Sequence, residues 1–122
     1  SRARDRRGYF LRRRYGISLK AKESLLDLQG HRCLICRGRP HTSHKVLQVD
    51  HDHDTEVVRG LTCGPCNRAI GNFQDSPENI AAALVYLASH GRFMSTPTLI
   101  QFLGALSAAH KIGENHPVIS TA

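Results

Sequence analysis

Apolar residues recur at helical spacing in two stretches near the end of the chain, and this pattern predicts two helices. The first stretch follows Ser76-Pro77, ends before Gly91 and consists of Ile80, Ala83, Leu84 and Leu87. The second follows Thr96-Pro97, ends before Gly113 and consists of Leu99, Phe102, Leu103 and Leu106. Proline suits the first helical position and glycine ends helices. Two apolar stripes on so short a chain predict either core packing or an interface between subunits.

The pattern before these helices predicts a helix, a hairpin and a shorter helix. A helix from about Leu19 to Gln29 begins after Ser18, whose hydroxyl can cap it, and ends at Gly30. Two short strands are expected at residues 46–51 and 57–61, joined by a polar segment. The shorter helix carries Cys66 and Asn67 and ends near Gly71, after a loop over residues 37–44. Together these elements predict an α+β fold that is mostly helical.

The length of 122 residues allows one modest core and no second independent one. We expect a basic arm over residues 1–17, a core over residues 18–75 and a helical region over residues 76–122. The arginine-rich beginning does not lead into an apolar segment, so no secretory signal is predicted. The longest apolar stretch is too short to span a bilayer, and we expect no association with a membrane.

The net charge of +7 is concentrated at the start of the chain. Residues 1–22 carry a net charge of +8, and the other residues carry −1. The candidate DNA-binding residues of this arm are Arg4, Arg6, Arg7, Arg12, Arg13 and Arg14. Cations that neutralise phosphates release condensed counterions, so such an arm suits binding to a nucleic acid backbone. The charge alone fits a solubilising tail equally well.

Four cysteines form two C-x-x-C pairs, Cys33 with Cys36 and Cys63 with Cys66. Two residues between the cysteines of a pair let both thiolates reach one tetrahedral ion, and four thiolates complete its coordination. A closed site of this kind makes the zinc structural. A redox motif needs only one such pair, so two pairs favour zinc over a thiol–disulfide function.

Six of the eight side chains of residues 49–56, between the two cysteine pairs, are carboxylates or imidazoles. A hard cation such as Mg²⁺ prefers oxygen ligands, and Asp50 can supply one. The amide oxygen of Asn67 can supply another if the zinc draws its helix against the strands. A neighbouring imidazole could then deprotonate a water molecule. A polar hairpin whose acids only form turns, and a second zinc or a calcium site, stay open as alternatives.

The ordered motif resembles that of the phage recombination endonuclease VII family. It begins with Cys33-x-x-Cys36, continues through Val49-Asp50-His51-Asp52-His53 and ends with Val58-Arg59-Gly60-Leu61-x-Cys63-x-x-Cys66-Asn67. This family belongs to the His-Me finger nucleases, which are HNH-like and are also called ββα-metal nucleases. The resemblance implies a ββα-metal finger that holds one catalytic Mg²⁺ or Mn²⁺ and is supported by the structural Zn²⁺.

The resemblance also implies a role for each matching residue. Asp50 and Asn67 would be the catalytic metal ligands, and His51 the general base that activates water. His53 would be an auxiliary residue that contacts the phosphate or positions the site. The implied reaction hydrolyses phosphodiester bonds of duplex DNA, above all branched DNA such as Holliday junctions, and leaves 5′-phosphate and 3′-hydroxyl ends.

The chain departs from the junction-resolving pattern at two positions beside the site. Gln48 stands where that pattern has a histidine, and Ile70 where it has an acid. Arg59 and Arg68 could hold phosphates or pair with the nearby carboxylates, and we favour a structural or mixed role for Arg59. The substrate therefore stays open, whereas the nuclease chemistry is retained.

Paired cuts across a junction require two active sites, so we expect a homodimer formed through the C-terminal helices. One alternative is a monomeric HNH nicking endonuclease, and another is a non-catalytic zinc-finger module that binds DNA. The resemblance also implies a cytoplasmic location in a bacterial cell, with a phage genome as the source.

Overall fold

The computed structural model describes residues 2–38 and 46–115, without the side chains of residues 2–5 and 10. The chain forms two compact units, Ser1–Asp75 and Ser76–Ala122, and each is described by itself. The loop expected over residues 37–44 lies almost wholly outside the described residues.

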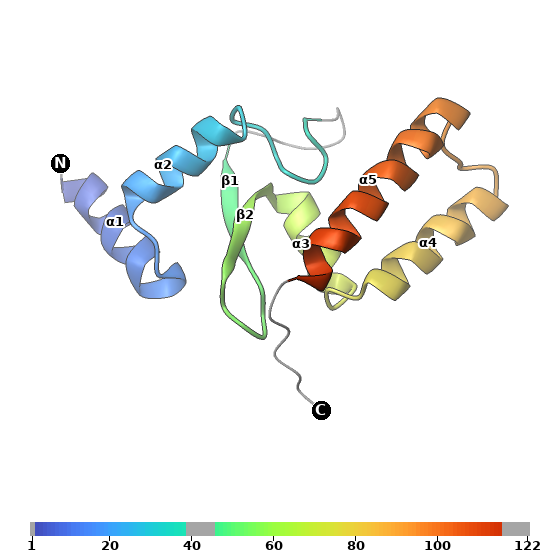
Figure 1. Ribbon diagram of the computed structural model, residues 1–122. Helices are drawn as coiled ribbons and strands as arrows, with labels where there is room; N and C mark the ends of the chain where they lie inside the picture. The colour runs from blue at the N-terminus through green and yellow to red at the C-terminus, as the bar shows by residue number, and fades with distance from the viewer. Residues whose placement is uncertain (1, 39–45, 116–122) are drawn as a thin grey trace. The chain divides into compact units, whose positions relative to one another are not determined.

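The first unit contains three helices and a hairpin, and the second contains two helices (Figure 1). The elements are α1 (Arg2–Tyr15), α2 (Leu19–Leu28), β1 (Leu47–His51), β2 (Val58–Cys63), α3 (Gly64–Asn72), α4 (Pro77–Ser89) and α5 (Thr96–Glu114). The described residues are therefore mostly helical with one small antiparallel sheet, in agreement with the prediction.

The segment expected to be a basic arm forms helix α1. Gly8, Leu11 and Tyr15 lie on one face of this helix at helical spacing, and the first two are buried. Leu11, with 6% of its surface exposed, belongs to the core of the first unit. The arginines whose side chains are described are exposed on the rest of the helix: Arg6, Arg7, Arg12, Arg13 and Arg14. Thus α1 packs through a narrow apolar face and displays its positive charge to solvent.

Strands β1 and β2 pair in antiparallel fashion, with a bulge at the end of β1 that is nearest the connecting turn. Asp50 pairs with Gly60, whereas His51 pairs with Val58, so Arg59 is the extra residue of the bulge. A bulge bends its strand and changes the direction of the side chain that it carries. This irregularity allows Arg59 to turn toward the carboxylate of Asp50.

The outer side of β2 is held by the segment that follows α2. The side-chain amide of Gln29 donates to the carbonyl oxygen of Leu61 at 2.9 Å and accepts from the N–H of Leu61 at 3.0 Å. The N–H of Leu34 donates to the same carbonyl oxygen at 3.2 Å. Gly60 is required here because a Cβ atom at this position would collide with Cδ1 of Leu34. The cysteine-bearing turn is thereby fixed against the sheet.

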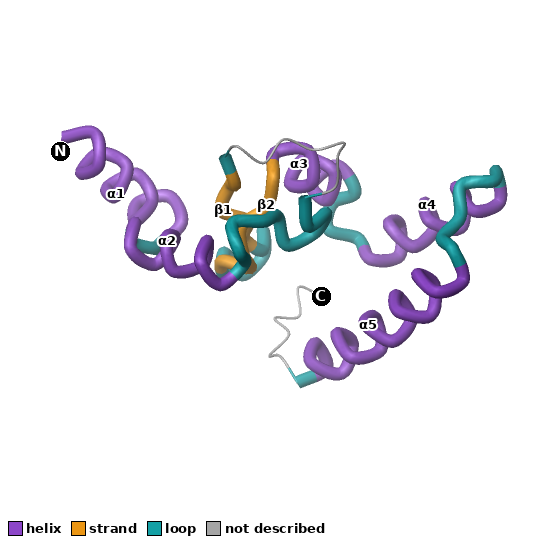
Figure 2. The backbone as a smooth tube through the Cα atoms, turned by 90° about the horizontal axis from the view of Figure 1, so that it is seen from above, coloured by secondary structure: helices purple, strands orange, loops and turns teal. Residues whose placement is uncertain are grey.

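Strand β2 leads directly into α3, whose N-cap is Cys63 and whose first residues are Gly64 and Pro65. Helix α3 contacts both strands, and α2 contacts β2 (Figures 1 and 2). The core of the unit is small. Apart from the cysteines, its buried hydrophobic residues are Leu11, Leu47, Val49 and Leu61.

The two apolar stripes of the second unit do not form a buried core. Helices α4 and α5 contain no buried residue, and they diverge from the loop that joins them (Figure 2). Of the stripe residues, Leu103 and Leu106 are more than half exposed and Leu87 is nearly half exposed, whereas Ala83, Leu84 and Phe102 are partly buried. The prediction of core packing is therefore wrong, because two helices that diverge cannot cover each other's apolar faces.

Helix α5 is capped by Ser95, not by Thr96, since the hydroxyl of Ser95 accepts from the N–H of Thr98.

No helix among the described residues is long and apolar enough to cross a membrane.

Candidate metal centre and active site

The four cysteines converge on one buried point although they come from two separate segments. Cys33 and Cys36 lie in the turn after α2, Cys63 ends β2, and Cys66 lies in the first turn of α3. All four are buried, and their sulfur atoms lie within 4.8 Å of one another. The Sγ atoms of Cys36 and Cys63 are 3.9 Å apart. Zn–S bonds of about 2.3 Å in a tetrahedron place sulfur atoms at about 3.8 Å, so the cluster could hold zinc.

The electrostatics of this cluster also suit a cation. Burial opposes ionisation of Cys33, but backbone N–H groups of Cys63, Cys36 and Ile35 face its sulfur and lower the pKa of its thiol. Burial and hydrogen bonds from the other three cysteines raise the pKa of the Cys66 thiol. Four crowded thiols cannot all ionise unless a positive charge balances them. A bound metal ion supplies that charge and keeps all four as thiolates.

The carboxylate of Asp50 is held by the guanidinium group of Arg59 through two hydrogen bonds. Nε donates to Oδ2 at 2.7 Å and Nη2 donates to Oδ1 at 3.0 Å. The remaining terminal nitrogen of Arg59 donates to Oδ2 of Asp75 at 3.1 Å and lies 4.0 Å from Oδ2 of Asp52. The hydrogen bonds that Arg59 donates to Asp50, and then to Asp75, raise the pKa of Arg59 despite its partial burial. Asp50, with only 7% of its surface exposed, therefore carries a fixed and charge-compensated carboxylate.

Asn67 is joined to the same strand by a side-chain hydrogen bond. Its amide nitrogen donates to Oε1 of Gln48 at 3.1 Å. Gln48 and Asp50 are two residues apart on β1, so they share a face of the strand. This bond uses the amide nitrogen of Asn67 as the donor. It joins α3 to the strand that carries Asp50.

Arg68 lies beside this bond at the start of α3. A Cβ atom placed on Gly64 would lie 3.1 Å from Nη1 of Arg68 and 3.6 Å from Nε2 of Gln48. Arg68 is exposed and forms no ion pair within residues 2–38 and 46–115. Its charge is therefore available to an anion close to Asn67, whereas the charge of Arg59 is used by carboxylates.

His51 ends β1 and is partly buried between two other rings. Its ring centroid lies 5.7 Å from that of Tyr15 and 5.3 Å from that of His53. Tyr15 belongs to the last turn of α1, so the basic helix contacts the proposed general base. His53 is exposed in the turn after β1, with its ring edge against His51.

Asp52 has a structural role in the turn between the strands. Its Oδ1 accepts from the N–H groups of Asp54 and Thr55 at 2.9 and 3.0 Å. These two bonds, with a smaller contribution from Arg59, lower the pKa of Asp52. The interpretation of these acids as turn formers therefore holds for Asp52 but not for Asp50.

Three residues that the structure places in contact with the site were not assigned to it from the sequence. Gln48 was known only as a departure from the family pattern, and Asp75 is distant in sequence from the hairpin. Tyr15 could have been found from its spacing of four residues from Leu11 on one helix face. The side chain of Arg4, a candidate DNA-binding residue, lies outside the described residues.

The chain matches the family model of recombination endonuclease VII over residues 9–89. It belongs to the recombination endonuclease VII family. The matched segment contains all four cysteines, the hairpin, α3 and α4. The family predicted from the sequence motif is thereby confirmed.

Two curated relatives are proteins of mycobacterial phages. The chain is 38% identical over 91 residues to the Gene 59 protein of Mycobacterium phage D29, which covers 74% of this chain and 50% of that protein. It is 37% identical over 91 residues to the Gene 59 protein of Mycobacterium phage L5, with 74% of this chain and 51% of that protein covered. The chain spans about half the length of these relatives.

The Arg59–Asp50 pair predicts a large difference between the two arginines beside the site. Replacing Arg59→Gln should lower the free energy of unfolding by about 1–3 kcal/mol, because Asp50 loses both hydrogen bonds from a charged donor. Arg59→Lys should restore only part of this loss, since an ammonium group cannot reproduce the planar pairing. Urea unfolding measures the difference, with Arg68→Gln as the matched control. Equal stabilities of Arg59→Gln and Arg68→Gln would contradict the assigned pairing.

Proposed function

We propose that the chain carries a metal-dependent DNA endonuclease centre that hydrolyses phosphodiester bonds in branched or distorted duplexes, such as Holliday junctions. The observation that carries this proposal is the hydrogen bond between Asn67 and Gln48, which joins α3 to the strand of Asp50 and His51 beside the cysteine cluster. Membership of the recombination endonuclease VII family supports the same chemistry. We further propose that β1, β2 and α3 form the ββα-metal finger of this centre.

Oxygen atoms of Asp50 and Asn67 would hold the catalytic Mg²⁺ or Mn²⁺, since hard cations prefer carboxylate and amide oxygens. When bound, this cation supplies positive charge to the phosphate and to the leaving 3′ oxygen. The guanidinium group of Arg59 fixes the direction of the Asp50 carboxylate, and each carboxylate oxygen retains a second lone pair for a ligand bond.

His51 accepts a proton from the water molecule that attacks the phosphorus atom. The bond between phosphorus and the 3′ oxygen then breaks, and the 3′ oxygen takes up a proton from solvent water. One product carries a 5′-phosphate and the other a 3′-hydroxyl. The rings of Tyr15 and His53 restrict the orientation of His51. His53 is exposed and is therefore suited to contact the phosphate as an auxiliary residue.

DNA would be attracted mainly by the exposed arginines of α1, and by its sequence position Arg4 is proposed to serve the same role. Three of these, Arg12, Arg13 and Arg14, lie in the last turn of the helix, where a positive charge also complements the helix dipole. Arg68 would hold a phosphate beside Asn67. The acids of the hairpin would otherwise repel DNA, so these cations are needed for binding.

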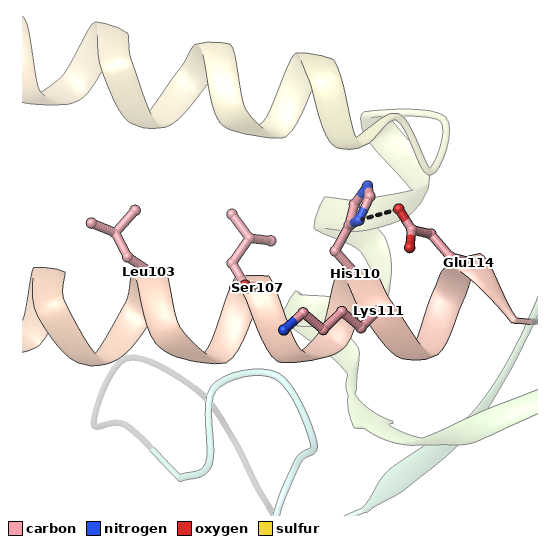
Figure 3. Close-up of a pocket in the computed structure, with 6 residues that line it drawn as sticks. Leu103, Ser107, His110, Lys111 and Glu114 are labelled. Atoms are coloured by element: carbon pink, nitrogen blue, oxygen red, sulfur yellow. Dashed lines mark ion pairs between the residues drawn. The ribbon is translucent and has the colours of Figure 1, made fainter.

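We also propose that α4 and α5 form a homodimer interface. Their large apolar side chains are exposed along most of both helices, and in water such surfaces are covered by a partner. One face of α5 is hollowed, with Leu103 and Leu106 among the residues that line the hollow. Figure 3 shows Leu103 toward one end of this face and His110 paired with Glu114, at 3.2 Å, toward the other. Two centres in one dimer would allow paired cuts across a branched substrate.

The role of His51 predicts a specific loss of cleavage. Replacing His51→Asn should reduce the rate of Mg²⁺-dependent cleavage by about 10²–10⁴-fold, because the general base is removed. Supercoiled and cruciform plasmids provide the substrates, and the products are resolved on gels. The matched control is His31→Asn, because His31 has a backbone φ of 58° that asparagine tolerates.

Equal rates for the His51→Asn protein and the wild type would refute the assignment of the general base. A wild-type protein that binds but never cuts either plasmid would favour a non-catalytic DNA-binding module. Cleavage of only one strand of ordinary duplex would favour a nicking enzyme of the HNH type.

The proposed interface predicts that acids on the leucine face of α5 separate the subunits. Leu103→Glu combined with Leu106→Glu should shift the dimer to a monomer, because buried charges at an apolar interface are costly. Size-exclusion chromatography with light scattering measures the mass, and Gln101→Glu on the same helix is the control. A wild-type monomer at micromolar concentration would contradict the dimer and the paired-cut mechanism.

A further inference from the structure

A groove of about 400 Å³ lies between α1, α2 and the start of β1, within the first unit. Its apolar lining comes from all three elements: Leu11, Leu19, Leu47 and Val49. Arg7 of α1 and Lys22 of α2 lie at the same groove, and none of the residues that line it is acidic. The volume lies within the range that is common for sites of small organic ligands.

We propose that this groove receives one unpaired nucleotide of the DNA substrate, with its base over the apolar lining and its phosphate groups near Arg7 and Lys22. This inference rests on the proposed nuclease function and specifies the kind of DNA that the centre selects. An apolar lining with two cations complements a ligand that has an apolar body and a negative charge, and a nucleotide combines both.

The groove borders the candidate active site through two of its own lining residues. The ring of Tyr15 lies 5.7 Å from the ring of His51. Gln48 lines the groove and accepts the hydrogen bond from Asn67 at 3.1 Å. A nucleotide in the groove is therefore held next to the phosphate on which His51 acts.

Only an unpaired base can occupy this position. In a duplex, each base is stacked between its neighbours, and a protein reaches its faces only after unstacking it at a cost of a few kcal/mol. This cost is smallest at a bulge, a mismatch or a branch point, where a base is already unpaired. The groove thus gives a physical reason for the selection of distorted duplexes, independent of the recognition of sequence.

Binding to two matched DNA ligands tests this inference. The ligands are a paired duplex and the same duplex with one extra, unpaired 2-aminopurine nucleotide, both measured in Ca²⁺ without Mg²⁺ or Mn²⁺. We expect about tenfold tighter binding of the bulged duplex, the low end of the contribution of one accommodated base. The 2-aminopurine fluorescence should also change when its base leaves water for the groove.

Two variants disturb the groove without changing its buried lining. Val46→Asp places a negative charge at the groove on a residue that is 72% exposed, and the double variant Arg7→Ala with Lys22→Ala removes both cations. Both should abolish the preference for the bulged duplex. The matched controls are Leu28→Asp, at a residue that is 83% exposed, and Arg13→Ala with Lys20→Ala. The double control variant, Arg13→Ala with Lys20→Ala, should weaken binding of both duplexes equally and leave the ratio of their affinities unchanged.

Equal affinities of the wild type for the two ligands, or a preference that survives in both groove variants, would overturn the inference. Cleavage assays in Mg²⁺ separate this outcome from failure of the proposed function. If the wild type cleaves DNA but shows no preference for the bulged duplex, the groove proposal is refuted and the nuclease proposal stands. If the wild type prefers the bulged duplex but does not cleave DNA, the nuclease proposal is refuted and the groove proposal is supported.

Discussion

The four buried thiols are the constraint on which the first unit depends. They bring the turn after α2 to the junction of β2 and α3. Among the described residues of this unit, the other buried hydrophobic side chains are only four. So small a core needs an additional covalent or metal link to be stable. The cluster also bears directly on the candidate site, because Asn67 follows Cys66 in the chain. The position of α3 against the hairpin, and hence the position of the Asn67 amide, is set at the cysteine cluster.

The positive charges of the first unit fall into two groups, which we call the inner layer, Arg59 at the hairpin, and the outer layer, the arginines of α1. Near the hairpin, Arg59 is held by Asp50 and Asp75, so its charge is used by these carboxylates and is not available to DNA. On α1, the arginines whose side chains are described are exposed, and under the proposed function they would attract a polyanion. A nuclease centre needs both layers, since uncompensated carboxylates would repel the phosphate that they must approach. The bulge at Arg59 accounts for the inward cation, because it lets this side chain reach Asp50.

The order of the elements after α1, and the convergence of the four cysteines, follow from the sequence because spacing, capping residues and apolar periodicity act locally. Helix α1 was expected only as a basic arm, because its arginines hide the narrow apolar face through which it packs. The pairing of Asn67 with Gln48 was foreseen only in outline, since the sequence indicates that α3 meets the strand but not which side chains meet. The contact of Arg59 with Asp75 depends on tertiary folding over sixteen residues and has no local signal. The apolar stripes of α4 and α5 show what a local signal does not contain. Periodicity predicts that each helix has an apolar face, but it does not predict what covers that face.

Binding of Mn²⁺ to protein of known zinc content, measured by electron paramagnetic resonance, tests the central claim most directly. That claim is that the cysteine cluster holds α3 and β1 together so that Asp50 and Asn67 can share one catalytic cation. The account predicts one bound Mn²⁺ for the zinc-loaded protein, and loss of that binding in Asp50→Asn and after removal of zinc through Cys36→Ser. Undiminished Mn²⁺ binding by the zinc-free Cys36→Ser protein would contradict it.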